Sequence, residues 1–336
     1  MKRTVIRATG RYVPPRLVTN QDLSDWMDTS DEWIRQRTGI EQRHWVPEEG
    51  GVGASDLALA AARIALDRCN WRPADLDLII FATLSPDIFF PGPGCLLQAK
   101  MGLTETPALD IRQQCTGFLY GMATADAFIR SGQANRILLA CAEVHSTGLD
   151  VSTRGRDVTV IFGDGAAAVC LEGVESDQPI GVLGSALHAN GELAESLMVE
   201  LGASRNNPRI TEEAVREGRH FPKMDGKTIF KEAVSKLPIV ANEALQKAGL
   251  GLDEIDLFIP HQANLRINQF FQQSMKLPES KVYHNIQRYG NTTAASIPLA
   301  LDEAIEKGLV KDGSAVMFLG LGAGLTWGAV ISRMGA

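Results

Sequence analysis

The chain has 336 residues, of which 45% are hydrophobic and 22% are charged, a composition typical of a soluble globular protein with a substantial core. Its net charge of −7 and isoelectric point near 5.5 argue against nucleic-acid binding, because phosphate neutralisation needs a basic face. No apolar run approaches the roughly 18 residues that span a membrane, and the chain begins with a short basic stretch and a strand-like segment. We therefore expect a cytoplasmic protein without a signal peptide or a membrane partner.

The five cysteines are odd in number, widely spaced and without a C-x-x-C pair. They are Cys69, Cys95, Cys115, Cys141 and Cys170. This pattern indicates neither a disulfide framework nor a zinc site, and we expect no metal and no resident cofactor.

Helix-like and strand-like segments alternate along the chain. Ser55–Cys69 has the apolar spacing of a helix, whereas Leu76–Thr83 and Ile137–Ala142 are short apolar runs typical of buried strands. This alternation predicts an α/β fold with mostly parallel strands.

Cys115 lies where a strand-like run meets a predicted helix, within residues 110–121. The start of a helix presents unpaired N–H groups and the positive end of the helix dipole, and both favour a thiolate over a thiol. Cys115 is therefore a candidate nucleophile. The alternative is a structural cysteine, because free cysteine is among the most buried residue types.

The second half of the sequence repeats the pattern of the first half in the same order. The matched segments are residues 74–81 with 253–259, 126–132 with 302–308, and 137–140 with 315–318. The spacing that carries Gly132 onto Gly308 also carries Cys115 onto Asn291, at the start of a second predicted helix. His261 follows the second copy of a strand, where ligands collect in parallel sheets. We expect Cys115, His261 and Asn291 to converge.

The repeat divides the chain into an N-terminal half, residues 1–174, that carries the cysteine and a C-terminal half, residues 175–336, that carries the histidine and the asparagine. Between about residues 191 and 228 the repeat is interrupted by a polar insertion that is rich in arginine. Two interpretations stay open for this insertion, a solvated surface loop and a lid over an active-site tunnel.

Cysteine, histidine and asparagine together support covalent catalysis, in which a thiolate attacks a carbonyl and N–H donors stabilise the oxyanion. Cysteine proteases use the same residue types, but the local sequence around the nucleophile of papain-like proteases is absent here. A histidine and an asparagine on separate elements suit an enolate, such as the one formed when a malonyl thioester loses CO2. The pattern favours acyl transfer followed by carbon–carbon bond formation, with a proton on Nε2 of His261.

Several short motifs, spread over nearly the whole chain, resemble those of the 3-oxoacyl-(acyl-carrier-protein) synthase III family. They lie at residues 28–34, 37–40, 110–121, 154–155, 162–166, 261–266, 290–292 and 322–328. The resemblance implies a thiolase-like fold, in which duplicated α/β halves form a five-layer αβαβα sandwich. It also implies a decarboxylative condensation of an acyl-CoA starter with malonyl-ACP, giving 3-oxoacyl-ACP, CoA and CO2 and initiating fatty acid synthesis.

The resemblance also implies roles for individual residues. Cys115 would carry the acyl group, His261 and Asn291 would stabilise the enolate, and the N–H groups of Cys115 and Ala323 would form a second oxyanion hole. The residues implied to bind coenzyme A are Trp33, Arg37, Arg154, Gly226, Phe230, Ala263 and Asn264. Those implied to dock acyl carrier protein are Lys231 and Arg266. Trp33 has an alternative interpretation as a buried residue in the first turn of a helix.

Three further residues bear on the acyl group. Phe90 matches a loop residue that, in the family, reaches into the partner subunit and limits acyl length, which implies a homodimer. Gln114 and Leu321 stand where the family often has alanine and an aromatic residue, so the acyl pocket is expected to be reshaped.

Two other functions stay open at this point. One is a specialised condensing enzyme of secondary metabolism, of the quinolone or polyketide type, that uses malonyl-CoA or an unusual starter. The other is a carrier-protein-binding module that has lost catalysis. The sequence leaves the length and branching of the starter acyl group open.

Overall fold

Two β-sheets form the centre of the computed structural model, which describes residues 1–335. The first sheet has five strands in the order β1 (Lys2–Tyr12), β7 (Gly165–Glu175), β6 (Arg136–Glu143), β4 (Leu78–Ala82) and β5 (Ala108–Ile111). The second sheet has four strands in the order β11 (Leu257–Pro260), β12 (Ala315–Gly322), β13 (Thr326–Arg333) and β8 (Gly181–Ala189). The chain thus passes from one sheet to the other between β7 and β8.

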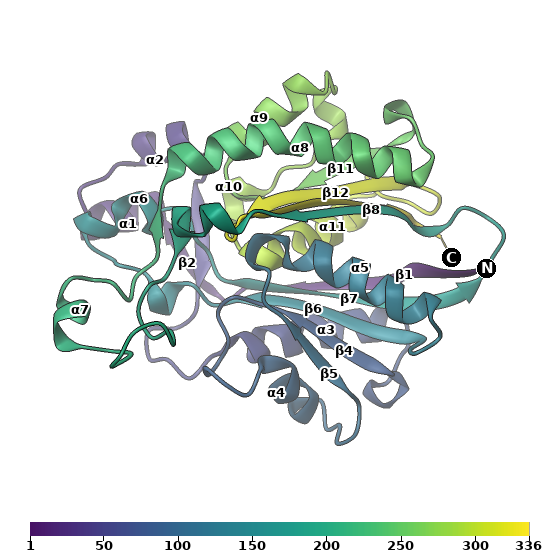
Figure 1. Ribbon diagram of the computed structural model, residues 1–336, viewed down its shortest axis with the longest axis horizontal. Helices are drawn as coiled ribbons and strands as arrows, with labels where there is room; N and C mark the ends of the chain where they lie inside the picture. The colour runs from purple at the N-terminus through teal and green to yellow at the C-terminus, as the bar shows by residue number, and fades with distance from the viewer. Residues whose placement is uncertain (336) are drawn as a thin grey trace.

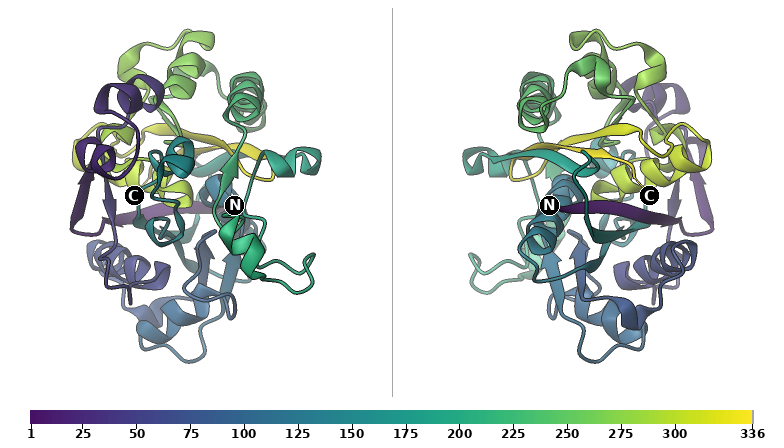
Figure 2. Two further views of the ribbon diagram at one scale, coloured as in Figure 1. Left: turned by 90° about the vertical axis from the view of Figure 1, so that its left-hand side faces the viewer. Right: turned by 90° about the vertical axis from the view of Figure 1, so that its right-hand side faces the viewer.

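Helices cover both outer faces of the sheets and fill the space between them (Figure 1, Figure 2). The outer helices are α3 (Ala54–Arg68) and α4 (Pro93–Lys100) on the first sheet, with α8 (Gly226–Ala248) and α9 (Leu265–Ser274) on the second. The central pair is α5 (Gly117–Arg130) and α11 (Ser296–Glu306). These layers confirm the predicted five-layer αβαβα sandwich and its thiolase-like α/β class.

The remaining elements flank this sandwich. Strands β2 (Arg16–Thr19) and β3 (Gln42–Trp45) pair in antiparallel fashion, and the chain between them forms α1 (Asn20–Trp26) and α2 (Asp31–Thr38). The other short elements are α6 (Arg156–Thr159), β9 (Leu197–Met198), α7 (Glu212–Arg216), β10 (Lys223–Met224) and α10 (Ile286–Tyr289). Among the described residues, no helix is both long and apolar enough to cross a bilayer.

The sheets are mixed, so the expectation of mostly parallel strands was wrong. Pairing is parallel where β4 lies between β5 and β6 and where β11 meets β12, and it is antiparallel elsewhere in both sheets. The reason lies in the connections. Strand β12 reverses into β13 through a tight turn, and β6 likewise reverses into its neighbour β7, whereas parallel pairing would need a crossover connection. The buried run of β4, in which every residue is inaccessible or nearly so, is the pattern of a central strand covered on both faces.

The internal repeat is real, but its register differs from the predicted one at the helix starts. One common spacing carries Leu78 of β4 onto Leu257 of β11 and Gly117 of α5 onto Ser296 of α11. Helix α5 has 14 residues and α11 has 11, so the offset between equivalent residues is three residues smaller at the ends of the two helices than at their starts. The predicted offset matches the helix ends only. Cys115 is therefore equivalent to Ala294, and Asn291 lies one helical turn before the true match.

The insertion at residues 191–228 divides into a base and a projecting tip. Leu197 and Met224, at the base, line the cavity described below, next to the start of α8. The tip around α7 extends from the sandwich and is largely exposed (Figure 1). The middle of the insertion thus lies in solvent, while its two ends meet at the cavity; the lid over a tunnel stays a prediction.

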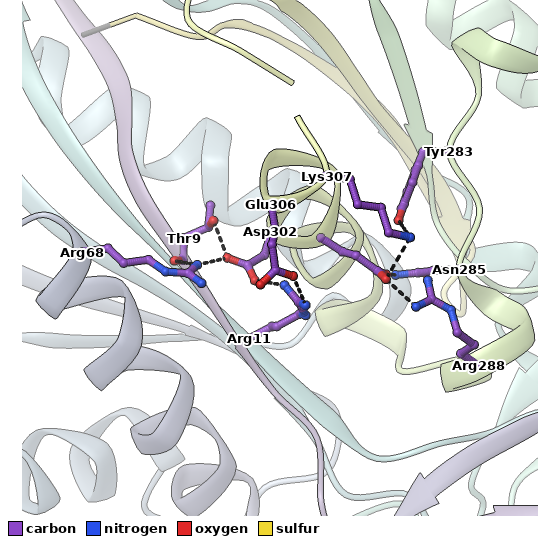
Figure 3. Close-up of polar contacts among 10 residues, drawn as sticks. Thr9, Arg11, Arg68, Tyr283, Asn285, Arg288, Asp302, Glu306 and Lys307 are labelled. Carbon is purple, nitrogen blue, oxygen red and sulfur yellow. Dashed lines mark hydrogen bonds and ion pairs between the residues drawn. The ribbon is translucent and has the colours of Figure 1, made fainter. Parts of the chain in front are cut away.

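Two neighbouring acids on α11 tie the central layer to its surroundings (Figure 3). The fully buried Asp302 accepts hydrogen bonds from Thr9 Oγ1 at 2.6 Å and from the guanidinium groups of Arg11 and Arg68. Glu303 accepts from Asn285, Arg288 and Lys307. A buried carboxylate needs this many donors to offset its lost hydration.

We expect Asp302→Asn to lower the free energy of unfolding by about 2 to 4 kcal/mol, because it leaves two partly buried guanidinium groups without their carboxylate. The comparison is Glu306→Gln, which removes an exposed carboxylate paired with the same Arg11 and should cost less than about 1 kcal/mol. Urea denaturation of both variants measures the difference. Equal losses would show that the buried position of Asp302 is not what matters.

Candidate active site

The cavity at the centre of the molecule has a volume of about 1040 Å³ and lies where the two sheets and the insertion meet. Cys115, His261 and Asn291 all line it, together with Leu321 and Gly322 at the end of β12. The cysteine comes from the first half of the chain, and the other two side chains come from separate segments of the second half. The predicted convergence of the three residues is therefore present in the structure.

Cys115 occupies a single 3-10 turn, Gln114–Thr116, that leads directly into α5. Gln114 has a left-handed backbone with φ of 45°, which turns the chain sharply out of β5. The thiol then packs against Gly322, where an added Cβ would lie 2.4 Å from Cβ of Cys115 and 2.9 Å from its Sγ. Only glycine fits at that position, so Cys115 and β12 touch.

Burial raises the pKa of the Cys115 thiol to about 12, with the neighbouring Glu143 adding to the rise. The backbone N–H groups of Ala323 and of Cys115 itself lie near the sulfur and oppose this rise. The helix start was expected to favour a thiolate; instead, loss of hydration on burial raises the pKa by more than the two N–H groups lower it. The same two N–H groups are those predicted to form an oxyanion hole, and both lie beside Sγ.

His261 follows β11 and presents one ring nitrogen to the cavity. Its Nδ1 lies 2.6 Å from Ser296 Oγ, which also accepts the Gln262 N–H at 3.3 Å. A Ser296 hydroxyl that donates to Nδ1 leaves the proton of the neutral ring on Nε2, which is the tautomer expected from the sequence. Burial lowers the pKa of His261 to about 3, so the ring is neutral at pH 7. Nε2 is buried and has no hydrogen-bond partner among the described residues.

Asn291 is held by its backbone and by one end of its amide. Its N–H donates to Ile161 O at 2.9 Å, and its carbonyl accepts from Gly163 N at 3.1 Å. Its Oδ1 accepts the Thr293 N–H at 2.8 Å. This bond assigns the amide, so Nδ2 is the atom left for a ligand. Asn291 Nδ2 and His261 Nε2 are thus two neutral donors on one cavity wall.

At the mouth of the cavity, two guanidinium groups flank the ring of Trp33. The Cζ atoms lie 4.3 Å away for Arg37 and 5.0 Å away for Arg156, measured to the ring centroid. Trp33 is half-buried in the first turn of α2, which begins after the N-cap Ser30. Its ring thus lines the mouth, where it can stack with a planar group.

The implied stacking role of Arg154 needs correction. Arg154 does not line the cavity; its guanidinium pairs with Asp150 at 2.5 Å and lies over Phe221 of the insertion. Arg156, two residues later and across the start of α6, is the arginine that faces Trp33. The sequence offered both arginines, and only the turn between them decides which one faces inward.

The structure brings most of the other predicted ligand-binding residues to the same cavity. Those that line it are Gly226, Phe230, Ala263, Asn264 and Arg266. Lys231 is exposed and is not part of the wall, whereas Lys227, which the sequence reasoning missed, is. Lys227 could have been found from the sequence, because it directly follows Gly226, a residue already predicted to bind coenzyme A, at the start of α8.

The three residues predicted to shape the acyl pocket are placed differently. Leu321 lines the cavity, whereas Gln114, the residue before Cys115, is not among the residues that line it. Phe90 is 79% exposed and packs edge-on against Phe89, away from the cavity of its own chain. Its implied role concerns a partner subunit and stays a prediction.

Comparisons with known proteins agree with this geometry. Residues 109–191 match the family described as 3-oxoacyl-(acyl-carrier-protein) synthase III, and residues 245–334 match its C-terminal counterpart. A β-ketoacyl-(acyl-carrier-protein) synthase III of Cereibacter sphaeroides is 43% identical over 98% of this chain and 99% of its own length. The chain belongs to the 3-oxoacyl-(acyl-carrier-protein) synthase III family.

Solved structures extend this similarity to three dimensions. The synthase III of Aquifex aeolicus is 42% identical, with a TM-score of 0.88 over 98% of this chain and 99% of that one. The priming β-ketosynthase of the R1128 polyketide pathway is 29% identical, with the same TM-score over 99% and 96% of the two chains. As a member of the synthase III family, the protein is a condensing enzyme of the acyltransferase class.

The raised pKa of Cys115 predicts how its alkylation depends on pH. With a pKa of about 12, about one thiol in ten thousand is ionised at pH 8, and the fraction grows about tenfold per pH unit. The rate of carboxamidomethylation of Cys115 should therefore rise steadily from pH 7 to pH 10, as measured by peptide mass spectrometry. The exposed Cys95 reports access of the reagent. If the alkylation rate of Cys115 reached a plateau below pH 8, the thiol would not have the raised pKa described above.

Proposed function

We propose that this enzyme condenses an acyl-CoA starter with malonyl-ACP and releases 3-oxoacyl-ACP, CoA and CO2. One observation carries the proposal: the nucleophile has two N–H groups at its sulfur, while two neutral donors, His261 Nε2 and Asn291 Nδ2, stand on the same wall. A single acyl transfer needs only the first pair of donors. A second pair suits a second oxyanion, formed at a different carbonyl.

The first half-reaction loads the enzyme. The Cys115 thiol loses its proton as Sγ attacks the thioester carbonyl of the starter, and the N–H groups of Cys115 and Ala323 stabilise the charge on the carbonyl oxygen. Collapse of this intermediate breaks the bond to the sulfur of coenzyme A, which leaves with a proton as the free thiol. The product is acyl-Cys115.

The second half-reaction forms the carbon–carbon bond. Loss of CO2 from the malonyl thioester leaves an enolate, whose oxygen accepts hydrogen bonds from His261 Nε2 and Asn291 Nδ2. The enolate carbon attacks acyl-Cys115, and the bond between the acyl carbon and Sγ breaks to give the 3-oxoacyl thioester. Sγ takes up a proton from solvent and returns to the thiol, so the second half-reaction consumes one proton and the neutral site is restored.

Intact-protein mass spectrometry tests this sequence directly. Incubation with a panel of acyl-CoAs should add one acyl mass to the wild type and none at this position in Cys115→Ala. Malonyl-ACP should then remove the acyl mass from the wild type and release CO2. His261→Ala and Asn291→Ala should still be loaded, but each should release CO2 at least about a hundredfold more slowly than the wild type. Condensation by Cys115→Ala would contradict the proposal. A faster reaction with malonyl-CoA would favour the specialised alternative, to which the R1128 priming enzyme is related.

The mouth of the cavity supports binding of the nucleotide of coenzyme A. Trp33 offers an aromatic face, and Arg37, Arg156, Lys227 and Arg266 are cations on or near the same rim. A base stacks on such a ring, and phosphates pair with guanidinium and ammonium groups. The same cations also suit an acidic carrier protein, with Lys231 exposed beside them.

Arg156→Ala should raise the KM for acyl-CoA about five- to thirtyfold, corresponding to one stacked or phosphate-bound cation. Arg154→Ala is the matched control and should change it less than about twofold, because that side chain pairs with Asp150 outside the cavity. Steady-state loading with acyl-CoA and with the acyl-pantetheine thioester separates the effects. Loss of affinity for acyl-pantetheine, which lacks the nucleotide, would contradict the role assigned to Arg156.

A further inference from the structure

A second buried histidine, His145, lies next to the active site and has no part in the reaction described above. It follows β6, is 8% exposed, and its ring packs against that of Phe162 with centroids 4.6 Å apart. Its backbone N–H donates to the buried Asp164 at 2.7 Å. Phe162 lines the cavity, whereas His145 stands one layer behind it.

The imidazole of His145 makes one contact to the segment that carries Asn291. Its Nε2 lies 2.7 Å from the hydroxyl of Thr293, in a hydrogen bond between two buried side chains. Burial lowers the pKa of His145 to about 3, with His261 nearby, so the ring is neutral at pH 7. This contact is therefore a neutral hydrogen bond that links β6 to the segment at Asn291.

Thr293 needs such support because its backbone is in the left-handed region, with φ of 48°. A β-branched residue rarely adopts this conformation, and it persists only where surrounding contacts hold it. The same backbone supplies the N–H that Asn291 Oδ1 accepts at 2.8 Å. If Thr293 relaxed, that N–H would turn away, and the amide of Asn291 would be free to rotate.

We propose that His145 is a positioning residue for the condensation step: it holds Thr293, and Thr293 in turn keeps Asn291 Nδ2 directed at the enolate oxygen. The chain of contacts runs from His145 Nε2 to Thr293 Oγ1, and from Thr293 N to Asn291 Oδ1. His145 itself touches no reacting atom. This inference rests on the proposed function, because it assigns a purpose to the orientation of the Asn291 amide.

The two half-reactions depend differently on this chain of contacts. Loading of Cys115 uses the sulfur and the N–H groups of Cys115 and Ala323, none of which His145 contacts. Decarboxylation of the malonyl thioester uses Asn291. Loss of the His145 contact should therefore slow the second half-reaction and spare the first, whereas general loosening of the core would slow both.

The experiment compares His145→Phe with the wild type in both half-reactions. Phenylalanine keeps a flat ring against Phe162 but removes the nitrogen that contacts Thr293. We expect acyl loading of Cys115 within about twofold of the wild type, and decarboxylation of the malonyl thioester by the loaded enzyme slowed about tenfold to a hundredfold. Intact mass measures loading, and CO2 release under single turnover measures the second step.

Two more variants keep the inference falsifiable if His145→Phe is poorly folded. His145→Gln places an amide where Nε2 stands and should recover most of the lost rate. Thr293→Val keeps the branched shape without the hydroxyl and should reproduce the loss, and combining it with His145→Phe should add little. His284→Phe is the matched control, since it removes a half-buried imidazole away from the cavity wall, and it should leave both steps unchanged.

The outcomes separate the inference from the proposed function. If the wild type loads and condenses while His145→Phe slows both steps equally, or neither, the positioning role is wrong and the proposed function stands. If the wild type neither loads nor releases CO2 with any malonyl thioester, the proposed function fails and the inference fails with it. Full activity of Thr293→Val would also overturn the inference.

Discussion

The active site depends on the close approach of β12 to two side chains from other elements. At Gly322 an added Cβ would overlap Cys115, and at Gly320 it would lie 2.9 Å from Cβ of His261. Two glycines on one strand thus allow the nucleophile of the first half and the histidine of the second to pack against the same backbone. The turn after β12 then delivers the Ala323 N–H to the sulfur. A side chain at either glycine would force these elements apart.

Burial decides the electrostatics of the site that this packing creates. Desolvation raises the pKa of Cys115 to about 12 and lowers that of His261 to about 3, so neither side chain carries a charge at pH 7. Negative charge then develops only during the reaction, where fixed N–H donors meet it in a medium of low dielectric constant. Neutral donors cost less to bury before substrate arrives than charged groups would, so a site in the core can be held ready.

Much of this could be predicted from the sequence, for reasons that can be stated residue by residue. Cys115 and His261 were found because each stands where an apolar strand ends, a pattern set by local periodicity. Asn291 was found with an offset that is about one helical turn too small. The offset was measured between the ends of the two equivalent helices, and it does not apply at their starts. Arg154 was assigned by resemblance to the family, and a matched motif does not show which way a turn directs its side chains. The His145 contact depends on long-range packing that no local pattern records.

The two copies of the repeat use one strained turn for different purposes. Gln114 and Thr293 occupy equivalent positions, and both have left-handed backbones, with φ of 45° and 48°. In the first copy the turn presents the next residue, Cys115, at the start of a helix. In the second copy its N–H is directed back to an amide earlier in the chain, at Asn291. The repeat thus contains the same backbone geometry twice: one copy of the turn places a cysteine at the start of a helix, and the other directs an N–H to the amide of Asn291.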